Sequence, residues 1–258
     1  MKRTAVVLAL VSALIVTTVA GEYSASLIMA KTITVPNDYA SIQGAIDAAK
    51  NGDTVHVKRG YYTETLVITN KSISVIGEDR NQTIIDARKR GGNVVLIEGA
   101  NHVTLANFTL GNGKSPDNRS QDTFDGMRIS SSDYSNIINN TIILIPFGNG
   151  INAESNNLLI EGNTIINCSH TAIIIRKSNN VVRNNEYANI EYFIPIYDLG
   201  DNNTVEGNHG ITVANMQSPF HEGIENHEFP ATIAAATILV IAAMVIGLVF
   251  FKKRKHTK

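Results

Sequence analysis

Asp122, Asp125 and Arg128 are the residues whose types and spacing come closest to a catalytic set in this chain. Acid–base cleavage of a glycosidic or ester bond needs two carboxylates, or a carboxylate and a base, on either side of the bond. Both aspartates fall at the end of a polar segment, Gly111 to Asp125. Whether the three groups can act together depends on the elements that position them.

Side chains suited to sugar hydroxyls gather in the same region. Guanidinium, amide and carboxylate groups donate and accept the hydrogen bonds that a hydroxyl-rich ligand requires. A solvated insertion without a role is the alternative interpretation, and the last two residues of the set could simply form a surface ion pair. The candidate ligand-binding residues are Asn118, Arg119, Gln121, Arg128, Asn152, Glu154 and Arg176.

Metal-ligating residues are scattered. The seven histidines show no ligand spacing on one element. Met216, His221 and His227 could bind copper, because thioether and imidazole groups suit that metal, but they lie in a flexible segment. We predict no cofactor and interpret these three residues as solvated side chains.

A repeat indicates which elements carry these groups. Similar segments end in Asn140, Asn163, Asn185 and Asn208, at steps of 23, 22 and 23 residues, and Phe108 takes the same slot in an earlier segment. Each unit holds short runs of Ile, Val and Leu broken by Gly, Asn, Asp and Ser, without room for a helix. The pattern predicts an all-β, right-handed parallel β-helix of about seven coils over residues 54–210.

The recurring asparagines have a structural role in that fold. Identical amides on successive coils can form a hydrogen-bonded ladder, so we expect Asn140, Asn163, Asn185 and Asn208 to stack in one column. The step from Phe108 to Asn140 is 32 residues, which predicts an inserted loop at Gly111 to Asp125.

Gly126, Gly150 and Ala172 occupy equivalent positions in three successive repeats. Their alignment predicts which residues of the strands that follow them point inward and which point outward. Strand alternation then makes the pairs Met127/Ile129, Ile151/Ala153 and Ile173/Ile175 point inward. Neither of the resulting outward columns stacks two carboxylates, so the alignment predicts no catalytic pair. The two outward columns are Arg128, Asn152, Ile174 and Ser130, Glu154, Arg176.

The two ends of the chain predict export and anchoring. Residues 1–30 have a basic start and an apolar stretch, typical of a signal peptide cleaved between 20 and 30, with an uncleaved anchor as the alternative. Residues 231–251 are 21 uncharged residues, the length of a transmembrane helix, and the basic tail 252–258 is expected to stay in the cytoplasm. We therefore predict a single-pass membrane protein with its β-helix outside the cell, joined to the span by a tether, 211–230.

The exported region has an acidic balance. Residues 31–230 hold 15 Lys and Arg against 22 Asp and Glu, a net charge of −7, which excludes a nucleic-acid partner. Cys168 is the single cysteine, so no intrachain disulfide can form. In residues 31–53 we expect a strand and an amphipathic helix within Asp38 to Lys50 that caps the first coil.

Seven Asn-X-Ser/Thr sequons are candidate glycosylation sites in an exported chain. Asparagine-rich turns also generate such sequons by chance. They begin at Asn70, Asn81, Asn107, Asn118, Asn139, Asn167 and Asn202.

Several segments resemble known families. ITVPNDYASIQ at 33–43, GDTV at 52–55 and GYYTE at 60–64 resemble the opening of a superfamily that contains pectin methylesterases and NosD-like proteins with carbohydrate-binding and sugar-hydrolysis (CASH) repeats. GNTI at 162–165 is similar to the NosD-like repeat. The resemblance implies a β-helix over residues 33–208 and leaves the activity open, because this fold hosts many functions.

Two further resemblances concern catalysis and anchoring. QDTF at 121–124 resembles a motif near the catalytic pair of pectin methylesterases, but the partner motif with a second aspartate and the Gly-Arg-Pro-Trp-like motif are absent, and the chain has no tryptophan. EFP at 228–230, followed by an apolar helix and a basic tail, resembles the sorting segments of archaeal surface proteins. That resemblance implies removal of the helix by a sortase as the alternative to a retained span.

Three functions are compatible with these features. The first is a non-catalytic cell-surface module that binds polysaccharide or envelope glycan. The second is a polysaccharide-modifying enzyme, either a lyase, a hydrolase or a carbohydrate esterase. The third, implied by the NosD-like resemblance, is an accessory protein for assembly of a metal centre.

Overall fold

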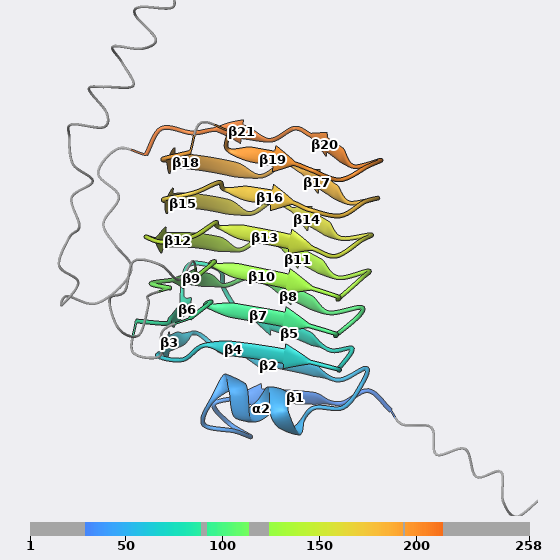
Figure 1. Ribbon diagram of the computed structural model, residues 1–258. Helices are drawn as coiled ribbons and strands as arrows, with labels where there is room; N and C mark the ends of the chain where they lie inside the picture. The colour runs from blue at the N-terminus through green and yellow to red at the C-terminus, as the bar shows by residue number, and fades with distance from the viewer. Residues whose placement is uncertain (1–28, 89–91, 114–123, 193, 214–258) are drawn as a thin grey trace, which may run out of the picture. The chain divides into compact units, whose positions relative to one another are not determined.

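The computed structural model describes residues 29–88, 92–113, 124–192 and 194–213. Their strands are all parallel and stack into three sheets, A, B and C, with consecutive strands visiting the sheets in turn (Figure 1). Six complete coils of three strands lie in these residues, with one strand before them and two after them. The predicted parallel β-helix of about seven turns is confirmed.

Sheet A forms one side of the helix. Its inward column consists of apolar residues that are fully buried, such as Val75, Leu105, Ile137 and Ile160. The strands, in order along the sheet, are β1 (Thr32–Val35), β2 (Thr54–Val57), β5 (Ser74–Gly77), β8 (Thr104–Ala106), β11 (Asn136–Ile138), β14 (Leu159–Glu161), β17 (Val181–Arg183) and β20 (Thr204–Glu206).

Sheet B follows sheet A in each coil. Its inward residues include Ile85, Leu110, Ile142 and Ile165, which are fully buried. The strands are β3 (Gly60–Tyr62), β6 (Thr83–Asp86), β9 (Thr109–Gly111), β12 (Thr141–Ile145), β15 (Thr164–Cys168), β18 (Glu186–Ile190) and β21 (His209–Gly210).

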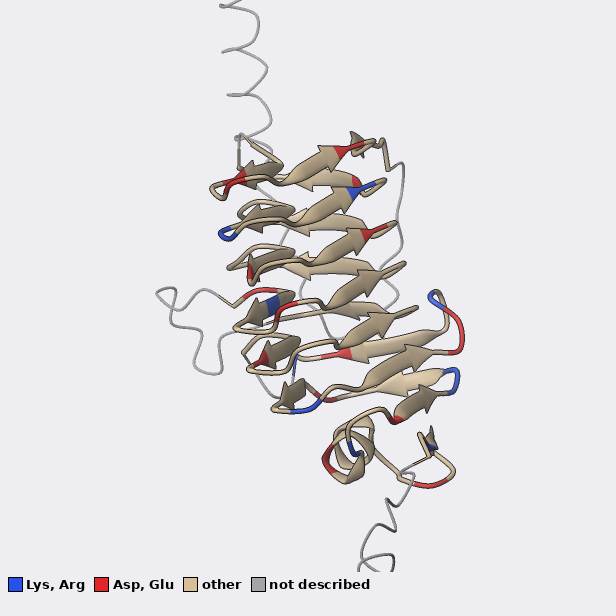
Figure 2. Cartoon of the chain, turned by 90° about the vertical axis from the view of Figure 1, so that its right-hand side faces the viewer, with Lys and Arg blue, Asp and Glu red and all other residues tan. Residues whose placement is uncertain are grey.

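Sheet C completes the coil and faces the viewer in Figure 1. Met127 pairs with Ile151, and Ile151 pairs with Ile173, so the register predicted from the three corner residues is the observed one. Figure 2 shows few charged residues along the strands, because most of them lie in the turns and at strand ends. The strands are β4 (Leu66–Thr69), β7 (Val95–Glu98), β10 (Met127–Ser130), β13 (Ile151–Glu154), β16 (Ile173–Ile175) and β19 (Ile196–Asp198).

A buried column of amides joins sheets A and B. The Oδ1 atom of Asn163 accepts from the backbone N–H of Asn140 at 2.9 Å and from the Asn140 Nδ2 at 3.2 Å, and Asn185 and Asn208 repeat this contact. Phe108 takes the first slot, where its backbone N–H donates to Asn140 Oδ1 at 3.1 Å. Each asparagine therefore satisfies a backbone group of the neighbouring coil, as the 22- to 23-residue step requires.

The residue before each ladder position has a left-handed backbone. Asn107, Asn139, Gly162, Asn184 and Gly207 have φ between 54° and 67°. Asparagine and glycine are the residues that adopt this conformation most readily. This corner explains why the repeated segments carry either Asn-Asn or Gly-Asn at the same point.

The N-terminal coil is covered by the helix α2 (Ile42–Ala48). We predicted a helix within Asp38 to Lys50, and the observed one is shorter, because the Asp38 backbone N–H donates to the Thr34 carbonyl in a turn and Ser41 acts as the N-cap. Ile42 and the other buried residues of α2 face the coil, as their helical spacing predicted. The helix closes the apolar interior at this end.

No helix of the described residues is long and apolar enough to cross a membrane. The predicted span at 231–251 and the basic tail at 252–258 lie outside the described residues, as do most of the predicted signal, 1–30, and most of the tether, 211–230. The export and membrane predictions therefore remain predictions.

Candidate functional site

The outer surface of sheet C brings together four of the predicted ligand-binding residues. Glu154 accepts from Arg128 Nη2 at 2.9 Å through Oε2, and its Oε1 lies 3.6 Å from Arg176 Nε. The two arginine side chains are 44% and 43% exposed, so their guanidinium groups remain accessible to a ligand. Sequence predicted the Glu154–Arg176 pair, and the structure adds Arg128 as the closer partner. We call this surface, with Asn152 and Tyr197, the Arg128 face.

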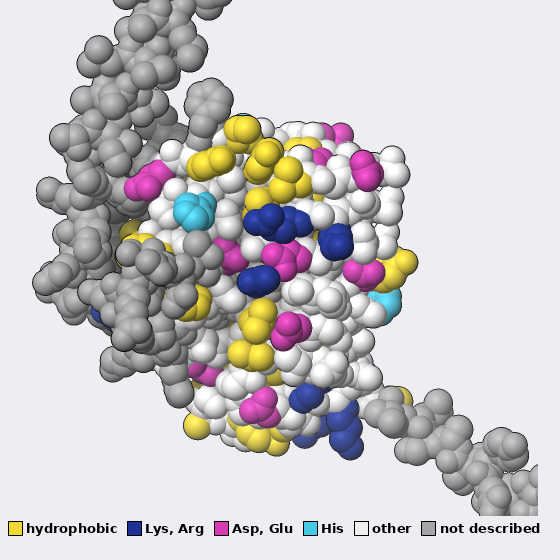
Figure 3. Space-filling view, viewed as in Figure 1, with side chains coloured by type: hydrophobic (Ala, Val, Ile, Leu, Met, Phe, Trp, Pro, Cys, Tyr) yellow, Lys and Arg dark blue, Asp and Glu magenta, His cyan; other side chains and the backbone are white. Residues whose placement is uncertain are grey.

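Apolar residues flank the charges on this face. Arg128 lies beside Leu96 on one neighbouring strand and beside Asn152 on the other, and the same column continues through Ile174 to Tyr197. Figure 3 shows yellow side chains on both sides of the central charged group. Tyr197 supplies an aromatic ring that the sequence-based site lacked. The column therefore places two polar residues, Arg128 and Asn152, between apolar and aromatic residues that can pack against C–H surfaces.

Asn152 differs from the predicted surface ligand. It points outward but is only 5% exposed, because its Nδ2 donates to Asp125 Oδ2 at 2.9 Å and its Oδ1 accepts from Arg176 Nε at 3.2 Å. Both ends of the amide are thus engaged. Asn152 positions Arg176 above Asp125, and a ligand would meet Arg176 first.

Asp125 lies at the end of the predicted insertion, in the corner directly before β10. It is 3% exposed, and its Oδ1 accepts from both the backbone N–H and the Nδ2 of Asn149 at 2.9 and 2.8 Å. Asn149 in turn accepts from Thr171, which makes a second polar column at this corner. With three donors on a buried carboxylate, Asp125 is an acceptor for neighbouring coils and is poorly placed to take a proton from a substrate.

A second carboxylate shares a column with Glu154. Glu98 pairs with Ser130, and Ser130 pairs with Glu154, so the two glutamates lie two strands apart on the outer face of sheet C. Their backbones are then roughly 10 Å apart, twice the strand spacing. The outward columns predicted from the sequence began at Arg128 and Ser130, so they did not include Glu98.

Sequence reasoning also missed a polar cluster on the outer face of sheet B. The Tyr61 hydroxyl donates to Asp86 Oδ2, Arg88 Nε donates to the same atom at 2.5 Å, and Asn112 Nδ2 donates to Asp86 Oδ1 at 2.9 Å. Asp86 is wholly buried by these partners. The sequence signal for this cluster was the alternation on one short strand, which places Ile84 and Asp86 on its outer face. The partners of Asp86 could not be predicted, because Tyr61 and Asn112 lie more than 20 residues from it in the sequence.

The cluster shifts the pKa values of its members. Burial alone would raise the pKa of Asp86, but hydrogen bonds from Tyr61, Asn112 and Arg88 outweigh it and hold the pKa below the ordinary value. Burial and the Asp86 carboxylate raise the pKa of Tyr61. Asp86 is therefore ionised and Tyr61 protonated at neutral pH, an arrangement that locks three coils together and leaves no nucleophile.

The other predicted site residues stand as follows. Asn118, Arg119, Gln121 and Asp122 lie outside the described residues, as do Met216, His221 and His227. Within the described part of the chain, no group of three His, Cys, Asp or Glu side chains could hold a metal ion.

Six of the seven sequons begin at described residues. Five of these asparagines occupy left-handed corners, where side chains lie at the surface, and Asn81 is also exposed. Asn70 and Asn202 are exposed, whereas Asn107 and Asn139 are joined by a hydrogen bond of 2.7 Å from Asn139 Nδ2. Asn167 is half-buried, and Asn118 lies outside the described residues. Glycosylation at all seven sequons stays a prediction.

Solved structures with similar folds include carbohydrate-active enzymes. The catalytic domain of a GH87 α-1,3-glucanase bound to nigerose aligns over 70% of this chain and 39% of its own, with 15% identity and a TM-score of 0.51. A pectin methylesterase bound to a hexasaccharide aligns over 62% of this chain at 15% identity, and the enzyme from Yersinia enterocolitica over 58% at 18%, with TM-scores of 0.44 and 0.42. The chain spans about half the length of each pectin methylesterase, 54%.

At these identities the similarity concerns the fold alone. No curated protein matches the sequence. The family model for the right-handed β-helix region matches residues 52–225, which is most of the stacked coils and about two thirds of the chain. With three parallel sheets and a buried asparagine column already established, the chain belongs to the right-handed parallel β-helix family.

Proposed function

We propose that this β-helix binds polysaccharide, without catalysis, along the Arg128 face. The observation that carries the proposal is the column from Leu96 through Arg128 to Tyr197, in which the exposed Arg128 guanidinium lies between apolar and aromatic side chains, with the Arg176 guanidinium in the adjacent column. A glycan chain laid along the helix axis would meet hydrogen-bonding groups and apolar surface in turn. The carbohydrate-active enzymes among the structural neighbours are consistent with a glycan partner.

The engaged carboxylates favour binding over turnover. Glu154 is held between two guanidinium groups, and Asp125 is buried under three donors. A catalytic carboxyl group must be free to approach the scissile bond, and neighbouring side chains already engage both of these carboxylates. The face can therefore hold a sugar chain more readily than it can cleave one.

The predicted signal and membrane span complete the proposal. They would place the β-helix outside the cell as a single-pass surface protein, where polysaccharide and envelope glycan are available. Sorting and removal of residues 231–251 would leave the same domain outside.

A binding assay with matched variants tests this proposal. The full-length chain is titrated with polygalacturonate and with an α-1,3-glucan, and the double variant Arg128→Ala/Arg176→Ala is compared with Arg183→Ala. Arg183 pairs with Glu161 on the outer face of sheet A, and its side chain is 41% exposed, so it is a matched control. We expect the double variant to lose about tenfold or more in affinity for the polymer that binds, since hydrogen bonds to charged groups are removed.

Two results would contradict the proposal. If the wild-type chain binds neither polymer, the proposal fails for these two glycan classes. If the double variant and Arg183→Ala lose equal affinity, the effect is a nonspecific effect of charge. Intact polymer after prolonged incubation supports binding without catalysis.

The column that holds Glu98 and Glu154 supports one second candidate, a polysaccharide hydrolase. Inverting glycosidases use two carboxyl groups separated by roughly 6.5 to 9.5 Å, and flexible side chains two strands apart can reach that separation. Release of sugar from either polymer that disappears in both Glu98→Gln and Glu154→Gln would establish this candidate. Turnover lost in Asp122→Ala instead would place catalysis in residues 114–123. The metal-assembly role implied by the NosD-like resemblance would require metal binding that depends on Met216, His221 and His227.

A further inference from the structure

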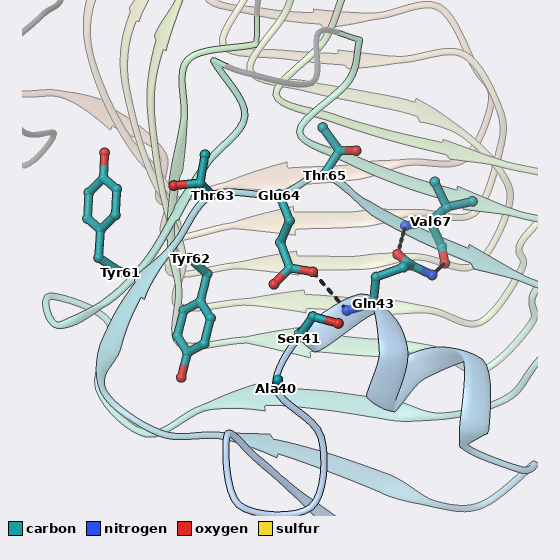
Figure 4. A pocket seen from close by; sticks show the side chains of 9 residues that line it. All are labelled: Ala40, Ser41, Gln43, Tyr61, Tyr62, Thr63, Glu64, Thr65 and Val67. Atoms are coloured by element: carbon teal, nitrogen blue, oxygen red, sulfur yellow. Dashed lines mark hydrogen bonds between the residues drawn. The ribbon is translucent and has the colours of Figure 1, made fainter.

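A cavity of about 460 Å³ lies between the capping helix and the first coil. Ser41 and Gln43 line it from the helix, and residues 61–65 line it from β3 and the turn that follows (Figure 4). One of its lining residues, Val67 on β4, shares an outward column with Leu96 and Arg128 and lies two strands from Arg128, whereas Tyr61 and Tyr62 belong to sheet B. A cavity of this volume falls within the range of small-molecule sites.

The cavity walls are held in place by hydrogen bonds. Glu64 accepts from the backbone N–H groups of Ile42 and Gln43 at 3.0 and 2.9 Å, which fixes the carboxylate at the start of α2. The Gln43 side-chain amide pairs with the Val67 backbone as a neighbouring strand would: its Oε1 accepts from the Val67 N–H at 2.8 Å, and its Nε2 donates to the Val67 carbonyl at 3.0 Å. These contacts exist without a ligand, so the cavity is preformed and binding would lose little conformational entropy.

Two half-buried tyrosines supply the aromatic surface. The Tyr62 hydroxyl donates to the Lys58 carbonyl at 2.8 Å, and the Tyr61 hydroxyl belongs to the Asp86 cluster. Each ring is thereby anchored at its polar end, while the rest of the ring is available for packing.

Two threonine side chains border the cavity on the other side of the strand from the Glu64 carboxylate (Figure 4). Thr63 and Thr65 both line it, and their hydroxyls have no hydrogen-bond partner among the residues that the structure describes. Glu64 keeps free lone pairs on oxygens that each accept one backbone N–H. A ligand with several hydroxyl groups could therefore be held by donors and acceptors that the fold leaves available.

The charge of the lining selects among such ligands. Among the residues that the structure describes, no lysine, arginine or histidine lines the cavity, and Glu64 is the one carboxylate. An anionic sugar would be repelled there, whereas a neutral sugar has an apolar C–H face for a tyrosine and hydroxyls for Thr63, Thr65 and Glu64. We propose that this cavity binds a neutral pyranose, as a free sugar or as the end of a short oligosaccharide. The proposal is independent of polysaccharide binding at the Arg128 face.

Ligand-observed NMR with the full-length chain tests the cavity. Glucose, mannose, galactose and the disaccharides maltose and cellobiose serve as neutral probes, with galacturonate as the anionic one. Saturation of the protein's aromatic protons should transfer to the C–H protons of at least one neutral sugar and not to galacturonate. Thr63→Val/Thr65→Val removes both hydroxyls at nearly constant volume and should weaken that sugar's binding by about tenfold.

Two further variants separate binding from folding. Thr69→Val makes the same chemical change at an exposed position on β4, outside the cavity lining, and should leave the affinity unchanged. Ala40→Trp, at an exposed residue of the lining, should fill the space and abolish binding while the melting temperature holds. The proposal fails if no neutral sugar receives transfer, if galacturonate binds as well, or if binding survives both Ala40→Trp and the double threonine variant. Failure of Arg128→Ala/Arg176→Ala to affect these sugars is expected and leaves the cavity assignment intact.

Discussion

The buried amide column and the Arg128 face are both polar, and both run along the stack of coils, yet they have opposite energetic characters. Asn163 is fully buried, and its side chain bonds two backbone groups of the preceding coil, the Asn140 N–H and the Ile137 carbonyl. Arg128 and Arg176 are nearly half exposed, and water can replace Glu154 as their partner. A buried polar group that loses its partner costs far more free energy than an exposed ion pair that opens. The interior column therefore maintains the fold, and the outer face is free to bind.

The largest expected effect follows from breaking the interior column. Asn163→Ala leaves the Asn140 N–H without its acceptor and the Ile137 carbonyl without the Asn163 donor, and it opens a small void. We expect a loss of about 3 kcal/mol in the free energy of unfolding, since each unsatisfied buried group costs roughly 1 to 3 kcal/mol. Urea unfolding measures the change.

Asn136→Ala is the control for this prediction. Asn136 is an asparagine of sheet A that points outward, and its side chain makes one hydrogen bond, of 3.3 Å, to Thr104. Equal losses for the two variants would show that burial does not distinguish the columns.

Acid is expected to weaken the Asp86 cluster next. Its pKa is lower in the folded chain than the ordinary value of 3.8, so its stabilisation is complete above about pH 4 and is lost as the pH falls through the folded pKa. At neutral pH, Asp86→Asn should cost about 2 kcal/mol because charge-assisted hydrogen bonds are lost.

The pH dependence supplies the test of that assignment. The difference in unfolding free energy between the wild type and Asp86→Asn should shrink as the pH is lowered from 6 to below 4. A difference that stays constant over this range would show that the ionised form of Asp86 does not hold the coils together.

A smaller effect is expected at the left-handed corner before Asn163. Gly162 has a φ of 66°, and a Cβ there would meet no atom within 4 Å, so the backbone conformation alone decides which residues fit. Gly162→Asn should change stability by less than about 0.5 kcal/mol, because Asn139 and Asn184 occupy the same corner. Gly162→Val should cost about 1 to 2 kcal/mol, because a β-branched residue is strained at positive φ. Thermal unfolding measures both changes. Equal melting temperatures for Gly162→Asn and Gly162→Val would contradict the prediction that the backbone conformation decides which residue fits.

The smallest change in stability belongs to the Arg128 face. Glu154→Gln removes the carboxylate that both arginines contact, yet exposed ion pairs contribute little, so the unfolding free energy should fall by less than about 0.5 kcal/mol. The effect should diminish further at high salt. A loss as large as that of Asn163→Ala would mean that this face is structural and not a binding surface.

Much of the fold could be predicted from the sequence, because the repeat shows the same pattern of inward, outward and corner residues in several coils. The steps between Asn140, Asn163, Asn185 and Asn208 follow from coil length, and the inward pairs of sheet C follow from strand alternation. Arg128, Glu154 and Arg176 could be placed on one face for the same reason. The period of the repeat and the alternation of side chains are local properties of the chain.

Other features depended on contacts that the repeat does not encode. The column containing Glu98 and Glu154, the position of Tyr197 beyond Ile174, and the burial of Asn152 over Asp125 all require the actual register at the coils that depart from the repeat. The cavity at the cap depends on how α2 seats against β4, through Gln43 and Val67.

The amino-acid sequence by itself therefore determined the coil, its period and the residue types at its corners. Hydrophobic alternation along a strand and the left-handed backbone of asparagine are properties of a few neighbouring residues. Only the tertiary structure decided which polar groups are satisfied and which remain available. Asp125 is a catalytic candidate in the sequence, but in the structure its carboxylate accepts hydrogen bonds from Asn149 and Asn152. The hydroxyls of Thr63 and Thr65, unremarkable in the sequence, are left open in a cavity. Hydrogen-bond satisfaction is a property of neighbours that lie 20 or more residues apart, and it exists only once the coils are stacked.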